Sequence, residues 1–164
     1  MPQLDLTFYQ LDVVMAYING DLEEEIILIK QPDSFIESGK ENIVCSLKKS
    51  LYGLKQSGRQ RFKKLDKQLK EFGLKSLDTE KCVYIMKTED IYLVIVVYMD
   101  DIIVGANSPD VYQRLKENLT KFKMKDLGTL HYCLEIEFKQ ERSNKSVMMI
   151  QKKYLQNILT TYSM

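Results

Sequence analysis

Two adjacent aspartates, Asp100 and Asp101, separate two apolar runs in the stretch VIVVYMDDIIVG, residues 94 to 105. One charge at a turn between strands is ordinary, but two adjacent negative charges need either water or a positive partner. A third carboxylate, Asp12, lies at the end of an expected strand at residues 6 to 13. If that strand lies beside the Asp100-Asp101 hairpin, the three carboxylates meet at one edge of a sheet and repel one another.

A divalent metal ion would remove this repulsion. Carboxylate oxygens suit Mg²⁺, which keeps several waters and takes its other ligands from substrate phosphates. Two such ions, roughly 3.5–4 Å apart, hold both the attacking and the leaving oxygen of a phosphoryl transfer. The spacing alone leaves a second interpretation open, in which Asp100 and Asp101 form a solvated turn without a metal.

The composition is that of an ordinary globular domain. The chain has 164 residues, of which 45% are hydrophobic and 29% charged, which suits one domain with a single core. The formal net charge is +1, so any basic surface for nucleic acid must be local. The longest apolar run, Ile91 to Met99, is too short to span a membrane, and the first ten residues show no secretory signal.

The cysteine and histidine content narrows the possible chemistry. Cys45, Cys82 and Cys133 are odd in number and far apart, so we expect buried free thiols in a reducing compartment. The single histidine, His131, leaves little material for a histidine zinc site or for a Ser-His-Asp triad.

Apolar periodicity predicts a mixture of strands and helices. Helices are expected at residues 58–72, at about 109–122 with Ser108 as N-cap and Pro109 at its first position, and at the C-terminus. Strands are expected at residues 6–13, 26–32, 43–47, 82–87, 91–99, 102–106, 130–138 and 146–150, with turns at Asn19-Gly20 and Asp100-Asp101. Because distant strands must share one sheet, this order predicts an α+β fold of the split β-α-β, ferredoxin-like kind. Its antiparallel sheet would have helices packed on one face.

Basic residues gather around the first expected helix. They are Lys55, Arg59, Arg61, Lys63, Lys64 and Lys67. A local basic face of this kind is suited to contact phosphates despite the small net charge. The alternative is a charged helix face that is merely solvated, which is the usual case for such a face.

Several motifs occur together in a fixed order. They are LDVVMAYINGDLEEEIILIKQPDSF, SLYGLKQSGRQRF, CVYI, YMDDIIVGAN, FKMKDLGTLHYCLEIEF and IQKKYLQNIL. In this order they resemble the reverse transcriptases of copia-type LTR retrotransposons, over about residues 8 to 164. The resemblance implies the palm of an RNA-directed DNA polymerase. Residues 1–150 would be partial fingers and palm, and residues 151–164 the start of the thumb or connection helix.

The resemblance also implies roles for the residues that match the motifs. Asp12, Asp100 and Asp101 correspond to the catalytic carboxylates, which hold two Mg²⁺ or Mn²⁺ ions. Tyr98 and Met99 correspond to contacts with the primer and template, and the LEIEF and SVMMIQ segments to the hairpin that holds the primer strand. Four residues match the nucleotide-binding segments: Tyr17, placed under the incoming sugar, and Tyr52, Gly53 and Lys55 of LYGLKQ.

The partners and setting follow from the same resemblance. They are an RNA or DNA template-primer and deoxynucleotide triphosphates, with no membrane, in an intracellular setting. In intact elements that setting is the cytoplasm within virus-like particles, or the nucleus. The enzyme is normally part of a larger polyprotein with integrase and RNase H.

Some positions depart from the family pattern. Val14 and Met15 stand where a lysine and a small polar residue are usual, Gly58 replaces a proline, Arg61 a tryptophan and Glu135 a glycine. The matched motifs do not include most of the fingers and thumb, nor the RNase H, integrase and protease regions of the family. These departures support an alternative hypothesis, a degenerate and non-catalytic remnant that acts at most as a nucleic-acid-binding or interaction module. On these grounds we expect the isolated chain to be inactive.

Overall fold

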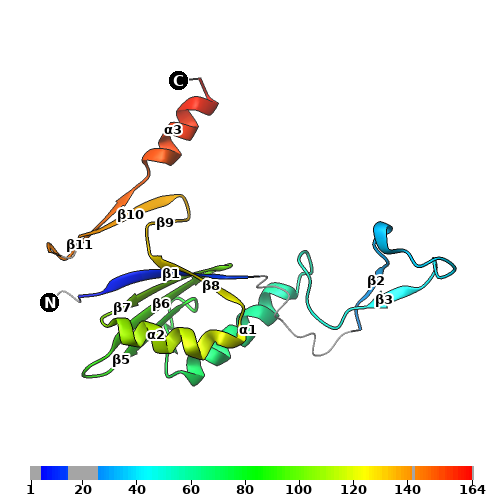
Figure 1. Cartoon of the computed structure of the whole chain (residues 1–164), viewed down its shortest axis with the longest axis horizontal. Coiled ribbons are helices and arrows are strands. Elements are labelled where there is room, and N and C mark those ends of the chain that lie inside the picture. Colours follow the sequence, from blue (N-terminus) through cyan, green and yellow to red (C-terminus); the bar gives the residue numbers. More distant parts are fainter. Residues whose placement is uncertain (1–4, 15–25, 142, 164) are drawn as a thin grey trace. The chain divides into compact units, whose positions relative to one another are not determined.

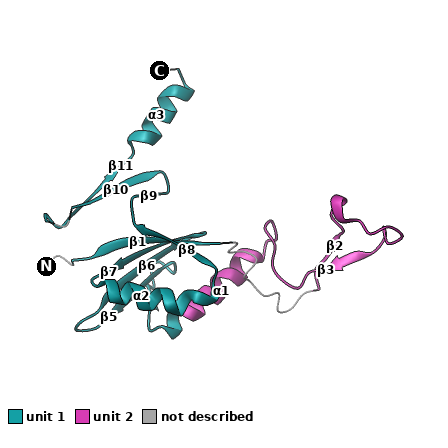
Figure 2. Cartoon of the chain, in the orientation of Figure 1, with its two compact units in different colours: residues 1–14, 69–164 teal, residues 15–68 magenta. Residues whose placement is uncertain are grey.

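The computed structural model describes residues 5–14, 26–141 and 143–163. The chain divides into two compact units, one of residues 1–14 with 69–164 and one of residues 15–68 (Figure 2). We call them the larger and the smaller unit and describe each by itself. The expected turn at Asn19-Gly20 lies outside the described residues.

A six-stranded sheet forms the core of the larger unit (Figure 1). Its strands, in spatial order, are β4 (Lys75–Ser76), β5 (Val83–Lys87), β6 (Tyr92–Tyr98), β7 (Asp101–Ala106), β1 (Thr7–Val13) and β8 (Met124–Thr129). Neighbouring strands run antiparallel. The N-terminal strand β1 lies between β7 and β8, so the strand that carries Asp12 pairs directly with the strand that carries Asp101.

One face of this sheet is buried beneath helix α2 (Pro109–Asn118). Alternation along β6 and β7 places Leu93, Ile95, Val97, Ile102 and Val104 on that face, and each is at most 5% exposed. The ring of Tyr112 on α2 stacks on Tyr9 of β1, with centroids 3.9 Å apart. Burial of these apolar side chains is the main stabilising term for the unit.

The ends of α2 follow the sequence prediction. The Ser108 hydroxyl accepts a hydrogen bond from the Asp110 backbone N–H at 3.2 Å, and Pro109 occupies the first turn. A short 3₁₀ helix, η3 (Leu119–Lys121), continues the segment, and both Leu119 and Phe122 are buried as expected. The mixed α and β fold with a large antiparallel sheet is therefore confirmed.

A second, three-stranded sheet follows β8 in the chain (Figure 1). It consists of β9 (Tyr132–Cys133), β10 (Ile136–Glu141) and β11 (Ser146–Ile150), with β10 in the middle. The predicted single strand at 130–138 is wrong, because Leu134 and Glu135 both have positive φ, 51° and 63°, and break it into β9 and β10. A glycine adopts that backbone without strain, so Glu135 occupies a position at which glycine is favoured.

The C-terminal helix α3 (Lys152–Thr161) matches the predicted helix. None of its residues is buried, so the apolar face that includes Leu155 and Leu159 is exposed. The Lys153 ammonium group lies 5.6 Å from the centre of the Tyr132 ring, which links α3 to β9. No helix in the described part of the chain is long and apolar enough to cross a membrane.

The smaller unit contains a two-stranded ribbon of β2 (Leu28–Lys30) and β3 (Val44–Ser46), with the 3₁₀ helix η2 (Asp33–Phe35) between them. Helix α1 (Ser57–Glu71) follows, and its residues from Leu69 onward belong to the larger unit. The predicted helix at 58–72 is thus confirmed to within one residue. Both ribbon strands are shorter than predicted.

The prediction that all three cysteines are buried is wrong for two of them. All three are free, as expected, but only Cys133 is buried. Cys82 is half-buried, and Cys45 is exposed because every residue of β3 is exposed. The apolar appearance of the IVCSL segment therefore does not indicate a core strand.

Gly105 provides a test of how β1 and β7 pack. It lies opposite Phe8 in the β1–β7 ladder, and a methyl group added to it would lie 2.9 Å from Phe8 Cε1. We predict that Gly105→Ala lowers the free energy of unfolding by about 1–3 kcal/mol, measured by urea denaturation, because the ring must move. In a Phe8→Ala background the same change should cost much less; equal costs in both backgrounds would contradict the packing.

Candidate active site

The pairing of β1 with β7 sets two carboxylates face to face. Asp12 is the cross-strand partner of Asp101. The Val13 N–H donates to the Asp100 carbonyl at 2.8 Å, so Asp12 and Asp101 form the adjacent non-hydrogen-bonded pair. In such a pair the Cα atoms are about 4.5 Å apart, and both side chains leave the same face of the sheet. Like charges at this spacing are destabilising unless a cation lies between or beside them.

The third carboxylate lies in the hairpin turn itself. The turn consists of Met99 and Asp100, and Asp101 is already the first residue of β7, which corrects the predicted Asp100-Asp101 turn. Met99 has a φ of 46°, which lets the chain reverse within two residues. The Asp100 Oδ1 atom is buried and has no hydrogen-bond partner among the described residues. A buried, unpartnered carboxylate oxygen is costly, and a bound cation would satisfy it.

Tyr98 and Met99 are both accessible at this turn. Their exposed fractions are 51% and 62%, respectively. Tyr98 is the cross-strand partner of Asp101 on the other side of β7. Tyr98, Asp101 and Asp12 are thus successive cross-strand partners on one face of the sheet, and Met99 and Asp100 form the turn at its edge. We call this set of residues the carboxylate face: Asp12, Tyr98, Met99, Asp100 and Asp101.

Two residues that the sequence analysis did not single out also belong to this face. The Gln10 side chain donates from Nε2 to Asp101 Oδ1 at 2.9 Å. Lys125 on β8 is the cross-strand partner of Asp12, on the side opposite Asp101. Asp12 therefore lies between a like charge and an opposite charge on the same face of the sheet. Nearby, burial and then the charge of Asp101 raise the pKa of the Cys133 thiol.

A bulge in β8 determines that Lys125 faces Asp12. The ladder pairs Tyr9 with Thr129 but Asp12 with Lys125, because one extra residue of β8 is inserted opposite the Gln10–Leu11 step. Without that insertion the register would place Asp126, a third negative charge, opposite Asp12. Gly128, with a φ of 76°, provides the left-handed conformation that the bulge requires.

Asp126 holds the bulge in place. Its Oδ1 accepts from the Gly128 N–H at 2.8 Å and from the Tyr112 hydroxyl at 2.6 Å, and its Oδ2 accepts from Lys116 Nζ at 2.7 Å. Burial raises the pKa of Asp126, but the hydrogen bonds from Lys116, Tyr112 and Gly128 outweigh it and lower the pKa overall. Burial, and then the hydrogen bond to Asp126, raise the pKa of Tyr112. The KDLG motif therefore joins β8 to α2 and sets the register beside Asp12.

The donors on the carboxylate face are those that Mg²⁺ or Mn²⁺ prefers, namely hard carboxylate oxygens. The unpartnered Asp100 Oδ1 fits this interpretation. Within residues 5–14, 26–141 and 143–163, however, no group of three or more histidine, cysteine or carboxylate side chains is close enough to hold a metal ion. The structure brings Asp12 and Asp101 together by register and places Asp100 beside them, without a completed three-carboxylate cluster.

The structure describes three of the four predicted nucleotide-binding residues. Tyr17 lies outside the described residues. Tyr52, Gly53 and Lys55 belong to the smaller unit, where Tyr52 and Lys55 are exposed and Gly53 has a φ of 90°. A residue with a Cβ atom would be strained at Gly53, which explains the glycine of LYGLKQ in terms of the turn before α1.

The predicted basic face of α1 needs one correction. Arg61 is only 7% exposed, so it is not part of that face. It occupies the position at which the family pattern has tryptophan, and its buried side chain fills a packing position there. The remaining five basic residues of the set are exposed: Lys55, Arg59, Lys63, Lys64 and Lys67.

Comparison with known proteins identifies the class to which this fold and these motifs belong. The family model described as "Reverse transcriptase (RNA-dependent DNA polymerase)" matches residues 3–164. The chain therefore belongs to the reverse transcriptase family.

Its relatives are proteins of copia-type retrotransposons. The chain is 37% identical over 163 residues to the Retrovirus-related Pol polyprotein from transposon TNT 1-94 of Nicotiana tabacum. This match covers 98% of the chain and 12% of that polyprotein. It is 32% identical to the corresponding polyprotein from transposon RE1 of Arabidopsis thaliana, covering 94% of the chain and 10% of the relative. It is 33% identical to the putative transposon Ty5-1 protein YCL074W of Saccharomyces cerevisiae. That match covers 86% of the chain and 46% of the yeast protein. The chain thus spans about a tenth of the plant polyproteins that it matches.

The opposed carboxylates should destabilise the fold when no metal is present. We predict that Asp101→Asn raises the free energy of unfolding in buffer with EDTA by roughly 0.2–1 kcal/mol, because it removes the repulsion with Asp12 while the Asp12–Lys125 pair and the acceptor oxygen for Gln10 stay in place. The matched control is Asp90→Asn, an exposed aspartate in the β5–β6 turn. Chemical denaturation measures both, and a loss of stability in Asp101→Asn would contradict the inferred repulsion.

The Asp126 network should make stability depend on pH. Since the folded-state pKa of Asp126 lies below the usual aspartate value of 3.8, its contribution is present above pH 3.8 and is lost as the pH falls through the folded value. We predict that Asp126→Asn lowers the free energy of unfolding at pH 7 by about 1 kcal/mol, allowing for partial solvent screening. Denaturation curves should converge at low pH; a constant difference across the range would contradict this account.

Proposed function

We propose that this chain is the palm segment of an RNA-directed DNA polymerase that transfers nucleotides onto a primer 3′-hydroxyl. The observation that carries the proposal is the opposition of Asp12 and Asp101, with Asp100 beside them, in a member of the reverse transcriptase family. Two divalent ions would supply Lewis-acid activation of the hydroxyl and would neutralise the leaving pyrophosphate. The three carboxylates would hold these ions.

The other residues of the carboxylate face would position the nucleic acid. Tyr98 and Met99, at the exposed hairpin tip, would contact the primer end and the template-primer backbone. Gln10, through its hydrogen bond to Asp101, would orient that carboxylate toward the metal. Lys125 would offset part of the negative charge around Asp12 before metal binds.

The nucleotide would be held by residues of the smaller unit. We assign to Tyr17 the place beneath the incoming sugar, where an aromatic ring excludes a 2′-hydroxyl and favours deoxynucleotides. Tyr52, Gly53 and Lys55 would line the nucleotide pocket, and the exposed lysines of α1 would approach phosphates. The natural context that we propose for the segment is a larger Pol polyprotein, since its relatives carry that name. The setting that we propose for this polyprotein is inside the cell.

The alternative function is a remnant without catalysis that binds nucleic acid or another partner. One observation favours it: Glu135 occupies a left-handed backbone position, next to the hairpin expected to hold the primer, where the family has glycine. The two proposals differ in whether binding of a template-primer depends on metal and on the carboxylates.

The test is the affinity of the chain for a labelled RNA–DNA primer-template, measured by fluorescence anisotropy with Mn²⁺ and with EDTA. We predict that Mn²⁺ tightens binding by the wild type about tenfold or more, because the ions bridge carboxylates and phosphate oxygens. Asp100→Asn should lose this gain, although it should bind somewhat better than the wild type in EDTA, since one repelling charge is gone.

Primer extension is measured in the same samples, with Asp90→Asn as the control. Mn²⁺-dependent extension that Asp100→Asn abolishes would support the polymerase function directly. Binding that falls steeply with salt, with no effect of Mn²⁺ or of Asp100→Asn, would instead support the remnant.

A further inference from the structure

We infer that Gln140 is a positioning residue that holds the β10–β11 hairpin to the strand carrying Asp12. The inference rests on the proposed function, because it assigns the hairpin a part in holding nucleic acid. Its basis is a set of hydrogen bonds between segments far apart in the sequence, Phe8 on β1 and Gln140 on β10.

The β1–β8 ladder leaves two backbone groups of Phe8 beyond its end. The ladder begins at Tyr9, paired with Thr129. By the alternation of hydrogen bonds along β1, the Phe8 N–H and carbonyl point away from β7, toward the β8 side. The Phe8 N–H in particular needs a partner there, because the carbonyl already accepts from the Leu130 N–H and an unpaired backbone group in a partly buried position is costly.

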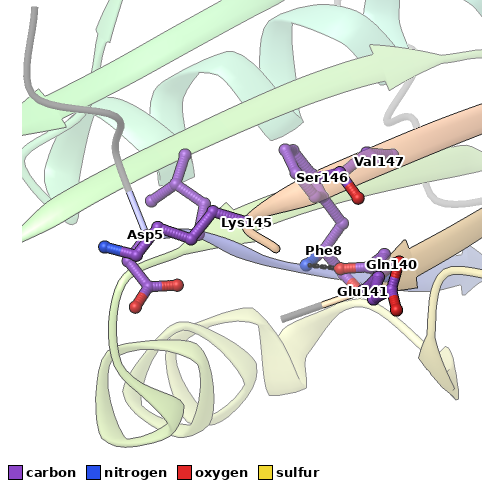
Figure 3. Close-up of a pocket in the computed structure, with 8 residues that line it drawn as sticks. Asp5, Phe8, Gln140, Glu141, Lys145, Ser146 and Val147 are labelled. Atoms are coloured by element: carbon purple, nitrogen blue, oxygen red, sulfur yellow. Dashed lines mark hydrogen bonds between the residues drawn. The ribbon is translucent and has the colours of Figure 1, made fainter. Parts of the chain in front are cut away.

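The Gln140 side chain supplies these partners in the way that a peptide unit of a strand would. Its Oε1 accepts from the Phe8 N–H at 2.9 Å (Figure 3). Its Nε2 donates to the Phe8 carbonyl at 3.0 Å and to the Leu130 carbonyl at 3.2 Å. The Leu130 N–H completes the set by donating to the Phe8 carbonyl at 2.9 Å. An amide is suited to this task, because it carries one acceptor and two donors, whereas a carboxylate has no donor.

The hairpin is otherwise loosely packed on β1. A pocket of about 60 Å³ lies between the start of β1 and the hairpin, lined on one side by Asp5, Leu6 and Phe8 and on the other by Gln140 and the β10–β11 turn (Figure 3). A space of this size holds a few waters at most. At this point the hydrogen bonds of Gln140 therefore attach the hairpin to β1 more than apolar packing does.

The link connects the hairpin to the proposed metal site through rigid elements. Phe8 lies on the same strand as Asp12, and its ring is held against Gly105 of β7. On the other side, β10 pairs with β11, which leads directly into α3. Gln140 thereby fixes the distance between the hairpin and the carboxylate face, and a template-primer that contacts both needs that distance to be constant.

The test uses the full chain with Gln140→Met, which keeps the side-chain length and removes the three hydrogen bonds. The matched control is Gln156→Met on the exposed surface of α3. We predict that the Phe8 amide exchanges with deuterium about tenfold faster or more in Gln140→Met, while amides inside the β1–β7 ladder keep their protection. Primer-template affinity should weaken by about tenfold, while Mn²⁺ affinity, followed by electron paramagnetic resonance, should not change.

The possible results separate the hydrogen-bonded link from its positioning role. Unchanged Phe8 exchange in Gln140→Met would overturn the link itself. Faster Phe8 exchange with unchanged primer-template affinity, or an equal loss of primer-template and Mn²⁺ affinity, would overturn the positioning role. If Gln140→Met does not fold, Gln140→Asn, which is one methylene too short to span the gap, takes its place. A wild type that does not bind primer-template at all would overturn the proposed function and this role together, and the exchange data would then show whether the link exists.

Discussion

The register between β1 and β7 is the constraint on which the rest of the site depends. It places Asp12 opposite Asp101 at the closest kind of cross-strand pair, beside the turn that carries Asp100. Both residues are half-buried, so water weakens the repulsion between these carboxylates only in part. The fold tolerates the arrangement because the same register buries Leu11 and Ile102 on the other face of the two strands.

Three features around this pair compensate for its cost in different ways. Gln10 donates to Asp101, Lys125 is brought opposite Asp12 by the β8 bulge, and Asp126 anchors that bulge to α2. The KDLG motif thus has a physical meaning: its glycine permits the bulge, and its aspartate faces away from the site that its lysine faces. A site that remains strained without its ligand is common where binding is the function.

The sequence predicted the strands that carry Asp12 and Asp101 well, because YMDD lies between two strongly apolar strands and Asp12 ends a third. It did not predict β8, whose residues include one lysine, one aspartate and one glycine and show no apolar alternation, as expected for a strand at a sheet edge. Lys125 was missed for that reason. Gln10 was missed because its contact with Asp101 follows only from the pairing of β1 with β7. Glu135 was read as part of one continuous strand, because nothing in LEIEF marks a left-handed turn when glutamate replaces glycine.

The central claim is that Asp12 and Asp101 are held together in order to bind a divalent cation. Titration of the purified chain with Mn²⁺, followed by electron paramagnetic resonance, tests it without requiring any nucleic acid or activity. The account predicts saturable Mn²⁺ binding by the wild type that is lost in the Asp12→Asn, Asp101→Asn double variant and kept in Asp90→Asn. Equal Mn²⁺ binding by the wild type and the double variant, or none by the wild type, would contradict it.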